Sequence, residues 1–328
     1  MYVRSYKDER MNKGWRRLRF RECVTMLSGG TPSKAIKAYW VGDIPWVSCK
    51  DMKTERIFDA LDHLNKDSVR NGTRLVALGT VLVVVRGMIL AKEFPVAIAM
   101  REIAFNQDLK ALKCAPFLTD RFLFYWLKSM THEILGLADE AAHGTKRLQT
   151  DRLESLEVDI PPRDVQETIT SVLSAYDDLI ENNTRRIKIL EQMAQMIYRE
   201  WFVNFRFPGH EKVRIVDSEI GPIPQRWAVK SLKDVSALIS RGISPTYNDA
   251  ADGLVINQKC IRNGRLSLAS ARRQSKKVPE EKMVREGDVL INSTGVGTLG
   301  RAAQVLEPIG NCTVDSHVLL PTKTGHLS

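Results

Sequence analysis

Residues 295–300 read Gly-Val-Gly-Thr-Leu-Gly and follow a predicted strand, which is the spacing of a dinucleotide-binding loop. Such a loop must open a helix and be followed, about 20 positions on, by an acidic residue. Here residues 301–306 lead instead to Pro308 and to more strand-like sequence. We interpret the segment as a turn that presents backbone NH groups and Arg301 to a phosphate. An enzyme that binds a nucleotide at this turn is retained as the least favoured hypothesis.

No other segment carries a complete catalytic or metal-binding motif. Residues 159–163, Asp-Ile-Pro-Pro-Arg, lack the aromatic residue that follows the prolines in amino-methyltransferases, and residues 280–282, Glu-Glu-Lys, lack the acidic partner of a nuclease motif. The five cysteines are not spaced as zinc ligands. The sequence therefore predicts neither catalytic residues nor a metal site in this chain.

The composition is that of a folded, basic protein. The 328 residues carry 49 Lys and Arg against 39 Asp and Glu, a formal charge of +10. This excess suits polyanionic partners such as nucleic acid, but charge alone predicts a merely solvated basic surface about equally well. The length predicts two domains. Scattered cysteines predict reduced thiols in the cytoplasm, and the charged N-terminal segment predicts no signal peptide. The most apolar run, residues 75–91, is too short for a membrane span and predicts a buried strand.

The chain contains an internal repeat. Gly79–Gly87 resembles Gly287–Gly295, and Asn106–Leu112 resembles Val314–Leu320, each pair lying 208 residues apart. Shorter matches precede them in the same order. Trp15 corresponds to Trp227, and Ser28–Ser33 corresponds to Ser240–Thr246. Glycine-bounded, β-branched runs predict strands, and residues 122–130 predict a short helix, so each repeat is expected to be a mixed α/β domain.

A long helix is predicted between the repeats. Pro161-Pro162 leads into it, Asp164 with Glu167 is expected to form an N-cap and capping box, and the helix must end before Pro208-Gly209. About 40 residues correspond to a rod of about 60 Å. Residues spaced three or four apart form one stripe along this helix, which is expected to pair with another helix or to dock a partner. The residues of the stripe are Val165, Ile169, Val172, Tyr176, Leu179, Asn183, Arg186, Leu190, Met193, Ile197 and Trp201. The alternative is an amphipathic helix lying on its own domain.

The chain resembles the DNA specificity subunits of type I restriction–modification systems. The resemblance rests on residues 29–33, 39–52 and the helix signature of residues 153–202, including Leu179-Ile-Glu-Asn-Asn183 and Ile197-Tyr-Arg-Glu-Trp-Phe202. It implies an α/β fold with two mixed α/β target-recognition domains separated by a long coiled-coil-type helix. The expected parts are a first domain over residues 1–160, the spacer helix over 161–207 and a second domain over 208–328.

The resemblance also implies a function and partners. The chain would read a bipartite target in double-stranded DNA, and its helix would dock methyltransferase (M) subunits, with a restriction (R) subunit joining for cleavage. It would not be an enzyme itself, and no membrane association is expected. No cofactor is expected in this chain, since S-adenosylmethionine, ATP and Mg would belong to the partner subunits. The runner-up hypothesis is a stand-alone DNA-binding regulator or adaptor without a methyltransferase.

The chain departs from the family pattern at its C-terminal end. When the 208-residue offset is carried forward, the second domain lacks its last part and the second conserved helix is absent, about 85 residues in total. The first helix would then lack a partner within the chain, so self-association through this helix is a further expectation.

Candidate DNA contacts follow from residue type and repeat position. Arg and Lys suit guanine and phosphate, whereas Asn and Gln suit adenine. The candidates in the first domain are Thr31, Ser33, Lys50, Arg86, Gln107, Lys110, Lys146 and Arg147, the last two in a segment His143-Gly-Thr-Lys-Arg147 suited to phosphate. The candidates in the second domain are Arg241, Gln258, Lys259, Asn292, Thr294, Arg301 and His317.

Overall fold

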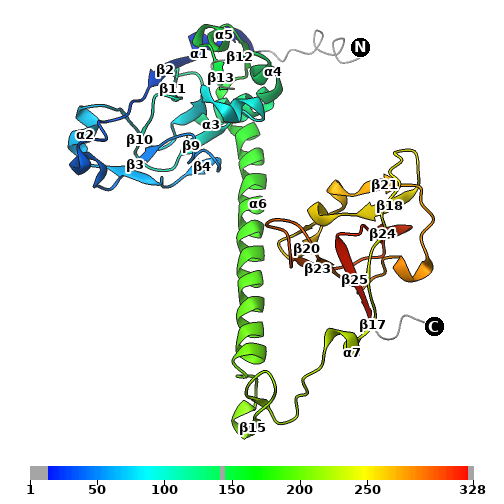
Figure 1. The fold of residues 1–328 in the computed structure, drawn as a ribbon. Helices are drawn as coiled ribbons and strands as arrows, with labels where there is room; N and C mark the ends of the chain where they lie inside the picture. The colour runs from blue at the N-terminus through cyan, green and yellow to red at the C-terminus, as the bar shows by residue number, and fades with distance from the viewer. Residues whose placement is uncertain (1–13, 141–144, 324–328) are drawn as a thin grey trace. The chain divides into compact units, whose positions relative to one another are not determined.

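The computed structural model describes residues 14–140 and 145–323, and its contacts divide the chain into two compact units, Met1–Gln192 and Met193–Ser328. Both units are mixed α/β, and a single long helix, α6 (Arg163–Tyr198), follows the strands of the first unit (Figure 1). The predicted fold class is confirmed. The predicted boundaries at residues 160 and 207 stay predictions. In the part of the chain that the structure describes, no helix is long and apolar enough to cross a membrane.

The first unit is built on two sheets. The larger has the order β2 (Val24–Ser28), β11 (Leu109–Cys114), β7 (Val81–Val84), β9 (Val96–Ala99), β4 (Arg56–Ile57). The smaller has the order β5 (Asp62–Leu64), β3 (Ile44–Val47), β10 (Ile103–Phe105), β6 (Leu75–Val76). Every residue of β7 is buried, as its unbroken run of valine and leucine predicts for a central strand.

Short strands and helices complete this unit. The strands are β1 (Arg16–Arg19), paired with β14 (Glu157–Ile160), and the group β12 (Ala138–Glu140), β13 (Lys146–Leu148) and β8 (Arg86–Gly87). The helices are α1 (Phe20–Cys23), α2 (Lys66–Arg70), α3 (Asp120–Ser129), α4 (Thr131–Gly136) and α5 (Thr150–Glu154). The predicted helix at residues 122–130 is confirmed as α3. The single strand predicted over residues 75–91 is wrong, because Gly79 (φ +90°) turns the chain after β6 and the segment forms three separate strands.

The second unit repeats the strand order of the first. Its sheet β17 (Ser236–Arg241), β25 (Val318–Lys323), β22 (Val289–Asn292), β23 (Ala302–Gln304) corresponds to β2-β11-β7-β9. Its other sheet has the order β21 (Arg272–Gln274), β18 (Gly253–Ile256), β24 (Cys312–Val314) and corresponds to β5-β3-β10. The strands β18 and β24 are parallel, as are β3 and β10. The internal repeat that the sequence predicted is therefore confirmed as a repeated topology.

The repeat alignment needs one correction. The amide of Asn106 donates to Val47 O, and the amide of Asp315 donates to Ile256 O, each at 2.9 Å. Asn106 is thus equivalent to Asp315, not to Val314, and this part of the repeat is offset by 209 residues. The strand pair β7 and β22 keeps the offset of 208, since Gly79 and Gly287 donate in the same way to Ala99 and Val305. A single added residue between these segments shifts the register.

The remaining elements of the second unit are short. They include a π-helical turn (Arg199–Val203), the strands β15 (Ile215–Val216), β16 (Ile223–Pro224), β19 (Ile261–Arg262) and β20 (Arg265–Leu266), and the helix α7 (Leu232–Val235). Aromatic rings gather after α6, where the indole of Trp227 lies 5.3–6.0 Å from the rings of Phe202, Phe205 and Phe207. Trp201 lies in the π-helical turn beyond the end of α6, so the heptad spacing predicted for it does not hold.

The start of α6 differs from the prediction. The helix begins at Arg163, so Asp164 lies in its first turn and is not the N-cap. Glu167 accepts a hydrogen bond from Arg163 (3.0 Å) rather than closing a capping box. The first helical hydrogen bond runs from Gln166 N to Pro162 O at 3.0 Å. A proline can begin a helix without loss, because its missing N–H would have no partner there.

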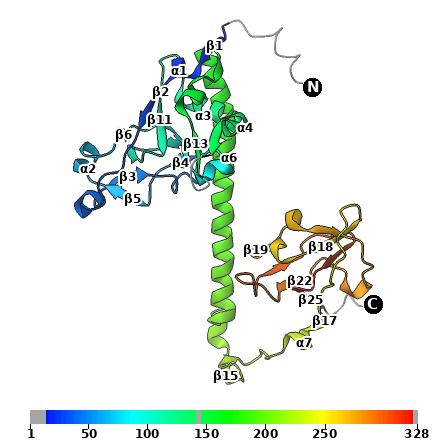
Figure 2. The same ribbon diagram turned by 45° about the horizontal axis from the view of Figure 1, so that its top comes forward.

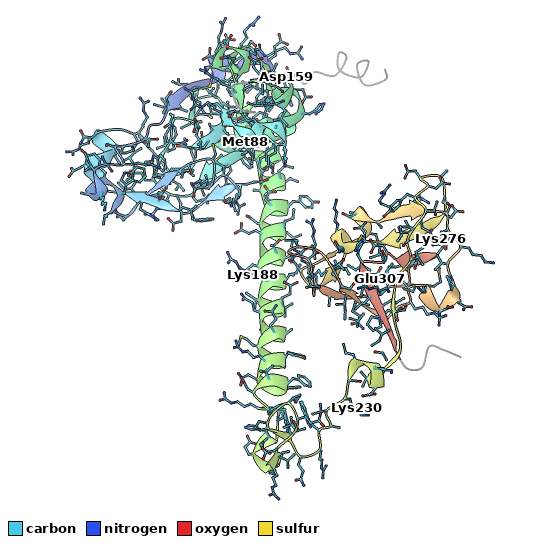
Figure 3. All side chains as sticks on the ribbon, in the orientation of Figure 1. Met88, Asp159, Lys188, Lys230, Lys276 and Glu307 are labelled. Carbon is cyan, nitrogen blue, oxygen red and sulfur yellow. The ribbon has the colours of Figure 1, made fainter. Side chains whose placement is uncertain are left out.

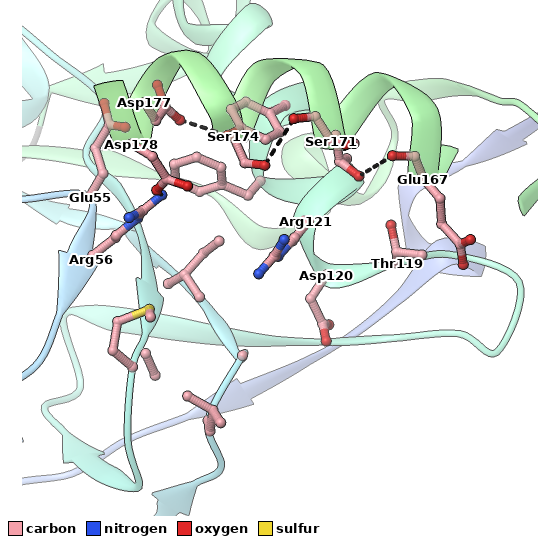
Figure 4. A pocket seen from close by; sticks show the side chains of 18 of the residues that line it. Glu55, Arg56, Thr119, Asp120, Arg121, Glu167, Ser171, Ser174, Asp177 and Asp178 are labelled. Atoms are coloured by element: carbon pink, nitrogen blue, oxygen red, sulfur yellow. Dashed lines mark hydrogen bonds and ion pairs between the residues drawn. The ribbon is translucent and has the colours of Figure 1, made fainter. Parts of the chain in front are cut away.

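One polar face of α6 is fixed to α3 and to neighbouring segments of the first unit. The side chain of Gln166 is completely buried, and its amide bonds with Phe117 O, Pro161 O and Thr119 N, each at 2.9 Å. Further along, Tyr125 donates to Asp177 (2.6 Å), and Arg56 contacts Asp178 (2.5 Å). Figure 4 shows Asp177 and Asp178 of α6 with Arg56 beside them.

The predicted apolar stripe occupies a different face. Val165 and Ile169 are half-buried beside the first unit, but Val172, Tyr176, Leu179, Leu190, Met193 and Ile197 are exposed, as are Asn183 and Arg186. The helix has 36 residues, about 54 Å, and only its first half touches the sheets of its own unit (Figure 2). The alternative was an amphipathic helix that lies on its own domain. It holds only for the first turns of α6, and the contacting face there is the polar one. Pairing through the stripe stays a prediction.

We expect Tyr125→Phe to destabilise the first unit by about 1–2 kcal/mol, because it removes a partly buried hydrogen bond to a charged carboxylate. The matched control is Tyr176→Phe in α6, where the side chain is 64% exposed and the expected change is below about 0.5 kcal/mol. Urea unfolding followed by circular dichroism measures both changes. Equal changes for the two variants would contradict the described anchoring of α6.

A second stability prediction concerns two equivalent glycines. A Cβ at Gly29 would collide with the carbonyl oxygens of Phe105 and Asn106, and one at Gly242 with those of Val314 and Asp315. Since backbone must move, Gly29→Ala and Gly242→Ala should each cost about 1–3 kcal/mol in urea unfolding. Gly136, in α4, has open space around its Cβ position, so Gly136→Ala should leave stability unchanged or raise it. A neutral Gly29→Ala or Gly242→Ala variant would refute this close approach.

Candidate nucleic-acid interface

In the first unit, the candidate side chains meet where several strands end. Thr31, after β2, donates a hydrogen bond to Gln107, after β10 (2.6 Å). Arg86, in β8, lies 3.1 Å from the carboxylate of Asp108, and its carbonyl accepts from the thiol of Cys49 (3.5 Å). Lys50 follows Cys49 and is exposed. Four candidates that are distant in sequence therefore form one polar surface.

The strand pair β8–β13 adds two cations to this surface. Arg147 lies directly opposite Arg86, and Lys146 opposite Gly87. His143 and Gly144 of the same predicted phosphate-binding segment lie outside the described residues. Like charges placed opposite one another on a sheet repel. Both arginines are exposed, and a polyanion bound over them would relieve that repulsion.

The second unit has the same arrangement with other side chains. The amide of Gln258 donates to the carbonyl and the hydroxyl of Thr294, each at 2.7 Å, and a 2.7 Å hydrogen bond joins that hydroxyl to His317 Nδ1. By the corrected alignment, Gln258, Thr294 and His317 are equivalent to Cys49, Arg86 and Asp108. Lys259, equivalent to Lys50, is again exposed.

Two further candidates are also related by the repeat. Lys110 lies opposite Ser28 and donates to its hydroxyl (2.5 Å), while Arg241 lies opposite Leu319. Each pair thus presents one cation, from β11 in the first unit and from β17 in the second. Ser33 is exposed in the opening segment.

Asn292 is a wrong prediction. Its side chain is 1% exposed and its amide donates inward to Gln258 O (3.2 Å), so it supports the loop of Gln258 and cannot reach a base. Residues 295–300 form a turn and open no helix, which removes the basis for the nucleotide-binding hypothesis. Arg301 closes this turn by donating to Gly297 O (2.7 Å), and its side chain is exposed.

The sequence did not reveal all the residues of the polar surface. Asp108 orients Arg86 but carries no distinguishing pattern. Arg272 lies 3.5 Å over the ring of Tyr247, beside a cavity of about 430 Å³ that Gln258 and Lys259 also line. Tyr247 follows the opening segment that resembles residues 28–33, and this position was its only sequence signal.

A larger cavity of about 750 Å³ lies between α6 and the sheets of the first unit (Figure 4). Its charged lining includes Glu55, Arg56, Arg121, Asp177 and Asp178, and none of the candidate DNA contacts. Burial, and then the hydrogen bond to Asp177, raise the pKa of Tyr125, so the phenol stays a donor at neutral pH. This cavity belongs to the attachment of the helix and not to the polar surface.

Comparison with known proteins agrees with this arrangement. The family model described as "Type I restriction modification DNA specificity domain" matches residues 12–192, more than half of the chain. The chain belongs to this family. The specificity subunit of the type I restriction enzyme MjaIX from Methanocaldococcus jannaschii is 31% identical over 238 residues, which are 71% of this chain and 54% of that protein. The EcoR124I/EcoR124II specificity subunit of Escherichia coli is 29% identical over 191 residues, or 56% and 46%.

The chain spans about half the length of the curated relatives it matches. A crystal structure of a type I restriction–modification system S subunit from M. genitalium has the same fold with a TM-score of 0.57. The two share 15% sequence identity, and the alignment covers 96% of this chain and 75% of that one. The likeness to a type I S subunit at this identity supports the fold alone.

The reactivity of the Cys49 thiol tests how deeply this residue is buried at the polar surface. Burial, followed by the nearby Asp108, raises the pKa of its thiol to about 11. The thiolate reacts and the thiol does not, so alkylation of Cys49 by iodoacetamide should rise nearly two orders of magnitude between pH 8 and pH 10.

The control is a cysteine introduced at an exposed position on α6, Ala175→Cys. With an ordinary pKa near 8.5, its alkylation should rise only about fourfold over the same range. Peptide mass spectrometry follows both sites in one sample. A Cys49 profile that levels off near pH 9 would contradict the described burial.

Proposed function

We propose that this chain is the DNA-sequence-reading subunit of a type I restriction–modification complex. It reads a bipartite target in double-stranded DNA, and adenine methyltransferase and nuclease subunits dock on it. The observation that carries the proposal is the repeated constellation Cys49, Arg86, Asp108 and Gln258, Thr294, His317. Different side chains on the same backbone frame are what two half-sites of different sequence require.

The electrostatics support DNA as the ligand. The cations at positions 50, 86, 146 and 147 lie around one surface of the first unit, and Lys259, Arg272 and Arg301 are exposed in the second. Contacts with phosphate position a protein on DNA, and contacts with base edges select the sequence. We assign Lys146 and Arg147 to phosphate. The base contacts are assigned to Thr31, Arg86, Gln107, Gln258 and Thr294.

The exposed stripe of α6 supports docking of partner chains. All residues from 182 to 199 are exposed, and an apolar stripe of this length stays in water only until a second helix covers it. We propose that methyltransferase subunits, or the helix of a second copy of this chain, occupy it. This chain supplies no catalytic group, and S-adenosylmethionine, ATP and Mg bind to the partners. The complex works in the cytoplasm, where the cellular DNA lies.

The test is a long-read methylation map of cells that express the full chain with its methyltransferase. We expect an interrupted two-part motif. Two different halves mean that both units of one chain read DNA, whereas a palindrome means that two chains pair through α6 and each contributes its first unit. With the methyltransferase present and stable, absence of any motif would refute the proposal. DNA binding without methyltransferase association would support the stand-alone regulator.

Charge-removing variants refine this test. Arg86→Ala should relax the motif at one position of one half-site, because a guanine contact contributes about 1–3 kcal/mol. Arg147→Ala should weaken binding to all sequences and reduce the salt dependence of log K by about one phosphate contact. The control is Lys113→Ala, an exposed cation at the other end of β11. If all three variants behave alike in duplex binding, the assigned surface is wrong.

A further inference from the structure

Each recognition unit exposes one apolar side chain at the same place in its fold. Gly87 follows Arg86 in β8, and Gly295 follows Thr294; the two glycines are equivalent by the 208-residue offset of β7 and β22. A Cβ on Gly87 would touch the thiol of Cys49, and one on Gly295 would touch the amide of Gln258, so both glycines lie against equivalent neighbours. The next residues are Met88 and Val296.

These two side chains are unusually open to solvent. Met88 is 72% exposed and Val296 is fully exposed. Figure 3 labels Met88 on the first unit (Figure 3). Isolated exposed apolar residues need no explanation on most protein surfaces. Met88 and Val296 differ from such isolated residues, because they occupy the same position in two repeats whose other side chains differ. Each also lies beside an equivalent polar cluster, which favours a shared role.

The surroundings identify the kind of ligand. Lys146 lies opposite Gly87, and Arg147 lies opposite Arg86, so two cations lie across the strand pair from the residues just before Met88. Val296 stands on the turn that Arg301 closes, next to Thr294 and its partners Gln258 and His317. An apolar contact ringed by phosphate-binding and base-reading groups fits the major groove, whose one apolar feature is the 5-methyl group of thymine.

Resting on the proposed function, we propose that Met88 and Val296 read a thymine methyl group, one in each half of the target. The geometry favours this over wedging between stacked bases. The side chains that wedge between stacked bases include Met but not Val, so a role shared by Met88 and Val296 does not fit wedging. Both Met and Val can enclose a single methyl group through van der Waals contact.

The experiment uses the full chain with its methyltransferase and a duplex that carries the mapped target. Each thymine is replaced in turn by deoxyuridine, which removes only the methyl group. We expect wild-type binding to weaken about fourfold at one thymine of each half-site, the effect of leaving one methyl group uncovered. Met88→Ala should abolish this sensitivity in the first unit's half-site only, and Val296→Ala in the second unit's half-site only.

The controls are two exposed apolar residues: Leu78 (65% exposed), which lines the cavity beside α6, and Leu306 (74%), which follows Val305 after β23. Leu78→Ala and Leu306→Ala should keep both thymine effects. The inference is overturned if the wild type tolerates every deoxyuridine, if Met88→Ala and Val296→Ala keep the wild-type pattern, or if the half-sites contain no thymine.

Fluorescence of 2-aminopurine placed within the target tests the wedge alternative. A rise on binding that Met88→Ala or Val296→Ala removes would indicate unstacking and would also overturn the inference. Absence of any sequence preference in the wild-type complex would refute the proposed function, and the thymine contact with it. A clear preference without thymine effects would refute the thymine contact alone.

Discussion

The arrangement of both α/β units depends on one close backbone contact. The turn after β2 lies against β10 so closely that Gly29 has no room for a Cβ, and Gly30 N donates to Phe105 O at 2.9 Å. The turn after β17 lies against β24 in the same way, through Gly242 and the bond from Ile243 N to Val314 O. This contact brings the opening segment of each unit beside the residues that follow the parallel strand. Without it, Thr31 would not meet Gln107.

The first unit has two charged regions, one where α6 is attached and one at the polar surface, and their charges are arranged in opposite ways. Where α6 meets the first unit, opposite charges are paired, with Arg56 facing Asp178 and Glu181. Nearby, Lys128 of α3 faces Glu55. Such pairs fix a geometry and leave little net field. At the polar surface, Arg86 and Arg147 oppose one another with Asp108 beside Arg86. The excess positive charge there is what a polyanion can use, and the paired charges along the helix are what a rigid attachment needs.

The long helix is stabilised unevenly along its length. Its first turns are anchored by the buried amide of Gln166 and by contacts that reach Glu181. Beyond that point its residues are exposed, and a solvated helix of such length gains little from hydrogen bonds alone. The anchored half is held against the first unit, while the exposed half leaves its apolar side chains uncovered in this chain.

The sequence by itself determined the periodic and repeated features. Alternating gaps of three and four predicted α6, and glycine-bounded valine runs predicted β7 and β22, because these patterns depend on local backbone geometry. Only the tertiary structure decided which faces are used. The polar face of Gln166 and Asp177 is bound to α3 through Thr119 and Tyr125, which lie about 50 residues away in the chain, while most of the apolar stripe stays exposed. The burial of Asn292, the pairing of Arg86 with Arg147 and the one-residue shift between Asn106 and Asp315 likewise depend on contacts between distant segments, which no local spacing records.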